Sequence, residues 1–188
     1  MTRGERPIKL GDIGVPNLGV TVLYELINSR TDALCERAYL PWLDMELKMK
    51  EYGIPLYSLE TFHPLLDFDI IGFTIPYETL YTNVLNALSL ASIPLHSSDR
   101  NEKHPLIIAG GHSAFNPEPM SDFIDVFVIG EGEEIIHDLL DTYTQWKRSG
   151  VNRLELLTTL QQIKGIYVPS LYNVTYNPDN SVKSVLPI

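Results

Sequence analysis

The stretch "PLIIAGGHSAFNPEPMSDFIDVFVIGEGEE", residues 105–134, contains one pattern twice. Each of its two apolar runs, 105–109 and 125–129, has the length of a strand and is followed at once by glycine and polar residues. Continuous apolar runs of this length are typical of strands buried on both faces of a parallel sheet. Since the carboxyl ends of parallel strands meet at one edge, the two glycine-rich segments are predicted to lie side by side.

Helical and strand patterns alternate along the rest of the chain. Helices are expected from apolar residues at helical spacing, and one of them is closed by Gly53. The predicted helices cover 17–29, 42–53, 78–93, 133–148 and 153–163. The predicted strands or extended segments cover 36–41, 54–60, 70–75, 105–109 and 125–129. This alternation predicts an α/β domain built from βα units around a mostly parallel sheet.

The chain changes character at Gly165. Its 188 residues are enough for one sizeable α/β domain, or for one domain with a small appendage. From Gly165 onward the pattern alternates and contains the turn signal "NPDN", which favours a β-hairpin over another βα unit. We therefore place the α/β domain at residues 1–164 and a hairpin or linker at residues 165–188.

Composition excludes several classes of partner. The formal net charge is -10, and the 14 lysines and arginines are scattered, so we expect no direct binding of nucleic acid. No run approaches the roughly 20 apolar residues needed to span a bilayer, and the start "MTRGERPIKL" lacks a secretory apolar region. We expect no membrane partner and a cytoplasmic location.

The sequence contains no catalytic constellation. Its single cysteine, Cys35, excludes an internal disulfide and any site made wholly from this chain's thiolates. Its five histidines form neither an HExxH motif nor a close pair, and no GxSxG elbow is present. We predict no catalytic residue and no metal ligand, which leaves open whether the chain is an enzyme.

The glycines that follow the two apolar runs are the first candidates for a binding site. Gly110 and Gly111 follow one run, and Gly130 and Gly132 follow the other. Such glycines let the backbone approach a ligand closely, but they equally permit a tight turn between a strand and a helix. The segment "GEGEE" argues against a phosphate site, because its carboxylates already complement the positive end of the following helix.

Four segments of the chain carry a family resemblance: "DIGVPNLGVTVLYELINSR", "AYLPWLDMELKMKEYGIPLYSLE", "FDIIGFTIPYETLYTNVLNAL" and "HPLIIAGGHSAFNPEPMSDFIDVFVIGEGEE". In this order they resemble the N-terminal cobalamin-binding-like domain of a family of radical S-adenosylmethionine proteins. The resemblance covers roughly Asp12 to Leu140, and the combination of "GG…FNPEP" with "VIGEGEE" is its most specific part. It implies a flavodoxin-like, doubly wound sheet.

The resemblance also implies a partner: a barrel that holds a [4Fe-4S] cluster on a CxxxCxxC motif and binds S-adenosylmethionine. That motif is absent here, so the barrel is expected in cis or in trans, beyond these 188 residues. Relatives also have an apolar strand before the first turn, whereas this chain offers only "RPIKL", which is short and half polar. We therefore expect a truncated first strand.

Cobalamin is the cofactor that the resemblance implies for this domain. Where a protein histidine binds cobalt, it comes from a DxHxxG motif; aligned on Gly14, that motif places Gly11 at the histidine and Lys9 at the aspartate. The resemblance thus implies binding without a histidine ligand, and the alternative is a cobalamin-free module that docks on the barrel or presents substrate. The implied cofactor-binding residues are Gly14, Thr74, Gly110, Gly111, His112, Ser113, Gly130, Glu131 and Gly132.

Overall fold

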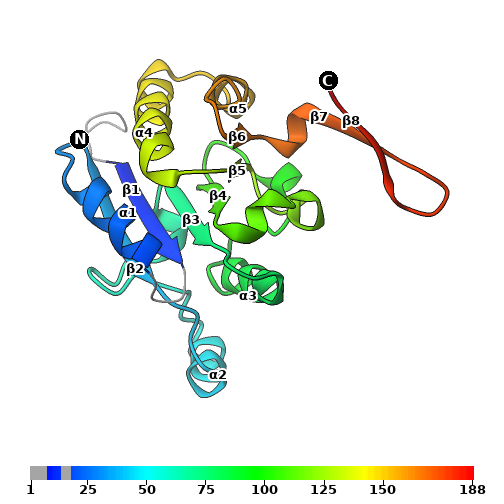
Figure 1. The fold of residues 1–188 in the computed structure, drawn as a ribbon. Coiled ribbons are helices and arrows are strands. Elements are labelled where there is room, and N and C mark those ends of the chain that lie inside the picture. The colour runs from blue at the N-terminus through cyan, green and yellow to red at the C-terminus, as the bar shows by residue number, and fades with distance from the viewer. Residues whose placement is uncertain (1–7, 14–17) are drawn as a thin grey trace.

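A six-stranded sheet forms the centre of the computed structural model, which describes residues 8–13 and 18–188 (Figure 1). Its strands are β1 (Ile8–Ile13), β2 (Ala33–Ala38), β3 (Ile70–Thr74), β4 (Leu106–Gly110), β5 (Val126–Val128) and β6 (Ile166–Tyr167). The order across the sheet is β2-β1-β3-β4-β5-β6, and β6 alone runs antiparallel to its neighbour. The first five positions have the flavodoxin-like order 2-1-3-4-5, which confirms the predicted doubly wound α/β fold.

Helices cover both faces of this sheet (Figure 1). They are α1 (Leu18–Asn28), α2 (Leu43–Tyr52), α3 (Tyr81–Leu90), α4 (Gly132–Ser149) and α5 (Arg153–Leu160). Ile27 of α1 and the buried apolar side chains of α4 and α5 belong to the apolar cluster on one face, and those of α2 and α3 belong to the cluster on the other. Each predicted helix is present, whereas segment 54–60 contributes only an isolated bridge between Tyr57 and Pro64.

Strands β3 and β4 are buried on both faces, as their continuous apolar runs predict. Ile70 and Leu106 belong to the cluster under α1, α4 and α5, while Ile71 and Ile107 belong to the cluster under α2 and α3. All four side chains are fully buried. Each contributes about 1.5 to 3 kcal/mol of hydrophobic free energy, so this pair of strands anchors both layers.

The expectation of a truncated first strand is wrong. Strand β1 is six residues long and lies inside the sheet, where it pairs with β2 on one side and with β3 on the other. Gly11 is part of this strand and not of a loop. A Cβ at Gly11 would lie 3.0 Å from Cδ1 of Ile71 and 3.3 Å from Cδ2 of Leu65, so glycine fits because the core leaves no room for a side chain.

The chain ends in a two-stranded antiparallel arm formed by β7 (Tyr172–Tyr176) and β8 (Val182–Pro187). The arm projects from the body of the molecule, and its turn contains Asn180 at a φ of 65° (Figure 1). Residues 166 and 167 add the sixth strand to the main sheet before the arm begins, so the segment predicted as hairpin or linker has two parts. The hydroxyl of Tyr176 donates a hydrogen bond to the carboxylate of Glu118 and ties the arm to the body.

Candidate functional site

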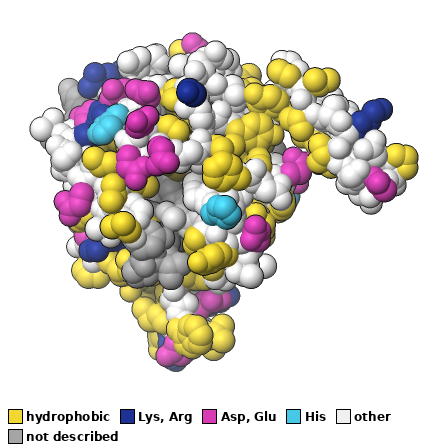
Figure 2. Space-filling model, in the orientation of Figure 1, with side chains coloured by type: hydrophobic (Ala, Val, Ile, Leu, Met, Phe, Trp, Pro, Cys, Tyr) yellow, Lys and Arg dark blue, Asp and Glu magenta, His cyan; other side chains and the backbone are white. Residues whose placement is uncertain are grey.

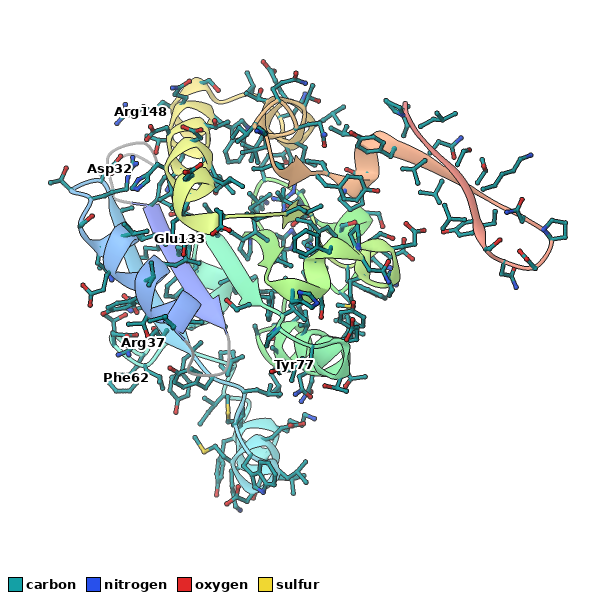
Figure 3. The ribbon with its side chains drawn as sticks, viewed as in Figure 1. Asp32, Arg37, Phe62, Tyr77, Glu133 and Arg148 are labelled. Atoms are coloured by element: carbon teal, nitrogen blue, oxygen red, sulfur yellow. The ribbon has the colours of Figure 1, made fainter. Side chains whose placement is uncertain are left out.

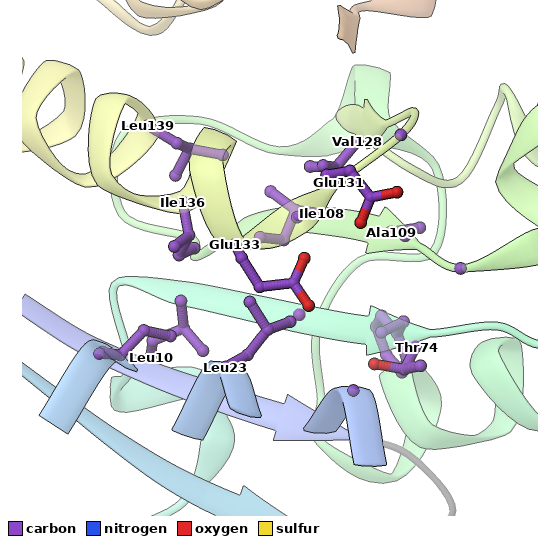
Figure 4. A pocket seen from close by; sticks show the side chains of 18 residues that line it. Leu10, Leu23, Thr74, Ile108, Ala109, Val128, Glu131, Glu133, Ile136 and Leu139 are labelled. Carbon is purple, nitrogen blue, oxygen red and sulfur yellow. The ribbon is translucent and has the colours of Figure 1, made fainter. Parts of the chain in front are cut away.

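A pocket of about 270 Å³ lies between the sheet and the helices α1 and α4 (Figure 4). The sheet contributes lining residues from β1, β3, β4 and β5, and the segment between β5 and α4 completes the wall. Most of the lining is apolar. Its aliphatic residues include Leu10, Leu23, Ile27, Ile108, Ile136 and Leu139.

The pocket lies where the strand order reverses. Strand β1 is followed by α1 on one face of the sheet, whereas α2 and α3 lie on the other face. In open α/β sheets this divergence leaves a crevice at the carboxyl ends of the strands, and ligands bind there. The lining includes Thr74 at the end of β3 and Gly110 at the end of β4, so the pocket reaches that edge.

All four glycines predicted at this edge line the pocket. Gly111 has a φ of 99° and Gly130 a φ of 113°, which are conformations that residues with a Cβ rarely adopt. At Gly130 a Cβ would have no atom within 4 Å, so a side chain there would project into open space. The backbone of this segment is therefore left bare beside the pocket.

Among the described residues, three polar side chains line the pocket: Thr74, Glu131 and Glu133. Figure 4 shows both carboxylates directed into the space between α1, α4 and the sheet, with Thr74 at the same end. Glu131 immediately precedes α4, and Glu133 lies in its first turn. The described lining contains no lysine, arginine or histidine, so the charged side chains among these lining residues are both acidic.

One protein family matches this chain. Its model, described as "Radical SAM proteins, N-terminal", covers residues 19–169. This range includes every strand from β2 to β6 and the two glycine-rich segments that border the pocket. The chain belongs to this family. Apart from Leu10, every described residue that lines the pocket lies inside the matched range.

A single protein illustrates how much longer such relatives are. A Methanocaldococcus jannaschii protein described as uncharacterized is 29% identical over 87 residues, which are 46% of this chain and 18% of that protein. The chain therefore matches less than one fifth of the length of this relative. No solved structure matches the chain significantly.

Two of the other implied cofactor-binding residues, His112 and Ser113, are not part of the pocket lining. His112 is exposed, and its ring lies 6.1 Å from that of Phe115. Ser113 is buried on the side of Tyr81, whose phenol pKa is raised by burial and by the charge of Glu78, while the Ser113 hydroxyl acts in the opposite direction. Gly14 lies outside the described residues. The structure thus brings Thr74 and the glycine-rich segments together at the pocket, whereas residues 112 and 113 lie outside its lining.

The described part of the chain contains neither a metal-binding cluster nor a helix suited to a membrane. Among residues 8–13 and 18–188, no three His, Cys, Asp or Glu side chains are grouped so that they could hold a metal ion. In that same part of the chain, no helix has the length and apolar character that crossing a membrane requires. Cys35 is buried, and its backbone amide and carbonyl bond to the side chain of Asn28.

The walls of the pocket were missed from the sequence. Leu23 and Ile27 of α1, and Ile136 and Leu139 of α4, follow the same helical spacing as ordinary core residues. Nothing in that spacing distinguishes a side chain that faces a cavity from one that fills the core. Glu133 was recognised as part of "GEGEE", but its direction into the pocket follows only from the way α4 begins over β4 and β5 (Figure 4).

Proposed function

We propose that this chain is the cobalamin-binding part of a radical S-adenosylmethionine protein. The observation that carries this proposal is the apolar pocket at the carboxyl edge of the sheet, bordered by Gly110, Gly111, Gly130 and Gly132. Concave, mostly apolar pockets with a few polar groups are where proteins of this architecture bind cofactors. Family membership supports the association with a radical S-adenosylmethionine catalytic part.

The residues present fit one part of cobalamin. A cavity of about 270 Å³ is just below the usual range of roughly 300 to 1,000 Å³ for small-molecule pockets, so it suits the aromatic base of the nucleotide tail and not the corrin ring. The base would contact Leu23, Ile108 and Ile136, and the corrin would lie outside, against the bare backbone at Gly111 and Gly130. When bound, cobalamin supplies a cobalt centre that can accept and donate an alkyl group.

A histidine ligand to cobalt is not part of this proposal. The Cβ direction at Gly11 leads to Ile71, Leu65 and Phe68, which belong to the core under α2 and α3. Position 11 therefore faces away from the pocket. The role of this chain is to bind and orient the cofactor, and to exclude water from its base with the apolar walls.

Titration with hydroxocobalamin tests the proposal directly. We expect a shift of the visible absorption bands on addition of the chain and co-elution of cobalamin with the protein on gel filtration. An unshifted spectrum together with separate elution would overturn cobalamin binding by this chain.

Filling the pocket gives a second test. The atoms nearest to a Cβ at Gly72 would be Ile108 side-chain atoms at 3.7 and 3.8 Å and the Gly11 carbonyl oxygen at 3.9 Å, which are ordinary contacts. Gly72→Val therefore places its Cβ without a clash and adds two methyl groups at the pocket wall, and β-branched residues suit a strand. We expect cobalamin affinity to fall at least about tenfold in equilibrium titration, as expected when a ligand group must be displaced.

The control for this variant is Ile71→Val, which alters the same strand on the opposite face. It is expected to cost about 0.5 to 1.5 kcal/mol of stability and to leave cobalamin affinity within about twofold. Equal affinity of Gly72→Val and the unmodified chain would argue that the cofactor does not use this pocket.

A second candidate function is a cobalamin-free docking module for the catalytic barrel. Large apolar side chains are exposed after the carboxyl ends of the first four strands: Leu18 (79%), Trp42 (81%), Tyr77 (68%) and Phe115 (66%). Tyr77 lies close to α3 at that edge (Figure 3), and hydrophobic side chains also gather on the projecting helix α2 (Figure 2). Exposed apolar groups of this kind favour an interface. The hydroxocobalamin titration separates the two functions, since the docking module predicts no binding.

A further inference from the structure

We propose that two copies of this chain associate through the outer edge of β7, so that their arms form one four-stranded antiparallel sheet. The surface lies outside the pocket, and the inference does not depend on cobalamin binding. It assigns a partner to the arm, namely a second copy of this chain, and names the strand at which the two copies meet.

The arm is a sheet of only two strands. In the described part of the chain, β7 and β8 pair with each other and with no other strand. The side chains of Tyr172, Val174 and Tyr176 alternate with polar ones along β7 and so share one face. Val185 of β8 lies opposite Val174 and is 42% exposed, and Figure 2 shows hydrophobic side chains on the projecting arm. Because a sheet of two strands is marginally stable in water, a further strand is expected to stabilise the arm.

The two edges of the arm differ in how well they resist a new strand. Strand β8 contains the charged Lys183 and ends at Pro187, which has no N–H to donate. Its register passes from Ser184 to Val182, so β8 bulges at Lys183. Charge, proline and bulges are the features by which natural edge strands prevent pairing. Strand β7 contains no charged residue and no proline, so a new strand is expected to join the arm at β7.

Strand β7 directs the backbone groups of alternate residues toward its outer edge. The N–H of Ile188 donates to the carbonyl oxygen of Leu171 at 2.9 Å, which makes these two residues a hydrogen-bonded pair. Bonded and non-bonded pairs alternate along an antiparallel ladder, so Tyr172 and Pro187 form a non-bonded pair. The residues of β7 whose N–H and C=O point to the outer edge are therefore Tyr172, Val174 and Tyr176.

The sequence of β7 makes this edge complementary to itself. Its five residues read "YNVTY", which is nearly the same in both directions. In a two-fold antiparallel pair centred on Val174, the two copies of Val174 lie opposite each other, and Tyr172 lies opposite Tyr176 of the second copy. The outward backbone groups then meet in register, aromatic rings pair across the junction, and Asn173 lies opposite Thr175. Such a contact uses the same patch on both copies and closes with two of them.

Charge and size set the strength of this contact. The chain has a formal net charge of -10, but β7 carries none of it, so no like charges lie opposite each other along the junction. A standard interface uses about 20 to 30 residues a side, and a strand of five residues falls well below that. We therefore expect a reversible dimer with a dissociation constant on the order of 10 to 100 µM.

Sedimentation equilibrium of the full chain, from about 5 to 500 µM, measures this dissociation constant. We expect Val174→Lys to raise it at least about tenfold, because two ammonium groups would then lie opposite each other. The matched control is Val185→Lys, which adds the same charge to the same face of the arm but on β8. Its dissociation constant should stay within about threefold of that of the unmodified chain.

Three results would overturn the proposal. A chain that stays monomeric over this range would exclude self-pairing and leave the β7 edge to a strand of the catalytic part. Equal weakening by the two lysine variants would show that the outer edge of β7 is not the junction. A dimer that Leu47→Lys dissociates and Val174→Lys leaves intact would use the exposed face of α2 and not the arm.

A covalent test checks the register without adding charge to the arm. In the proposed pair the Cα atoms of the two residues 174 are about 5.5 Å apart, which a disulfide can bridge. The two residues 185 are three strand spacings apart, about 14 Å, which is too far. We expect Val174→Cys to form a covalent dimer on oxidation with diamide and Val185→Cys to form none, with the buried Cys35 present in both. Failure of Val174→Cys to cross-link, or equal cross-linking of the two variants, would overturn the pairing.

Discussion

Replacing Gly111 with alanine is expected to lower the free energy of unfolding by roughly 3 to 5 kcal/mol. The residue has a φ of 99°, and a Cβ there would lie 2.9 Å from the carbonyl oxygen of Ile75 and 3.1 Å from its carbonyl carbon. Those are backbone atoms, so they cannot move away from the new Cβ as the end of a flexible side chain could. The same oxygen also accepts the backbone N–H of Ser113 at 3.1 Å. The loss is a large share of the roughly 5 to 15 kcal/mol that stabilises a typical domain.

The neighbouring glycine provides the control. At Gly110 a Cβ would meet the carbonyl oxygen of Val128 at 3.7 Å and its Cβ at 3.8 Å, both ordinary contacts, and its φ is not positive. Gly110→Ala is therefore expected to change stability by less than about 1 kcal/mol. Urea unfolding followed by circular dichroism measures both variants. Similar midpoints for the two would contradict the strain assigned to Gly111.

The layers of the fold could be predicted because the runs that form β3, β4 and β5 have the length and apolar continuity of buried strands. The first strand could not, because only one of its faces is apolar. Ile8 and Leu10 point into one core, whereas the ammonium group of Lys9 lies 5.9 Å from the ring centre of Phe68 on the other face. The backbone N–H of Lys9 also donates to the carboxylate of Asp69 at 3.0 Å. These partners come from a distant part of the chain, so the segment "RPIKL" does not reveal them.

The glycines at the edge of the site could be predicted from the sequence, but the positions of the side chains that follow them could not. Glycines after a strand mark the carboxyl edge wherever the strand lies, so Gly110 and Gly130 were found from local pattern alone. The direction of the chain after Gly111 depends on its positive φ, which leaves His112 exposed and Ser113 buried beside Tyr81. A dihedral angle of this kind follows from packing against Ile75, which lies 36 positions earlier in the sequence.

A buried ion cluster joins the end of the β4–β5 connection to α5. One oxygen of Asp125, Oδ2, accepts hydrogen bonds from Nη1 of Arg100, from Nη2 of Arg153 and from the backbone N–H of Ile107, each at 2.8 Å. All three charged residues are less than a tenth exposed. Burial lowers the pKa of the Arg100 guanidinium, and the charge of Asp125 opposes this shift. Asp125 is therefore the counter-charge for two buried cations.

Removing that counter-charge is expected to be as costly as the strain at Gly111. Asp125→Asn should lower the free energy of unfolding by roughly 3 to 5 kcal/mol, because it leaves two guanidinium groups buried without an anion. The exposed Asp122→Asn nearby should change stability by less than about 0.5 kcal/mol.

Adding Arg153→Met to Asp125→Asn tests the cause of this loss. If uncompensated positive charge destabilises the single variant, removing one cation should restore about 1 kcal/mol or more, even though Arg153 also bonds to the carbonyl oxygens of residues 101, 104 and 105. Urea unfolding of the four proteins gives these differences. A double variant less stable than Asp125→Asn would show that the cluster acts through the hydrogen bonds of Arg153 to the backbone and not through balanced charge.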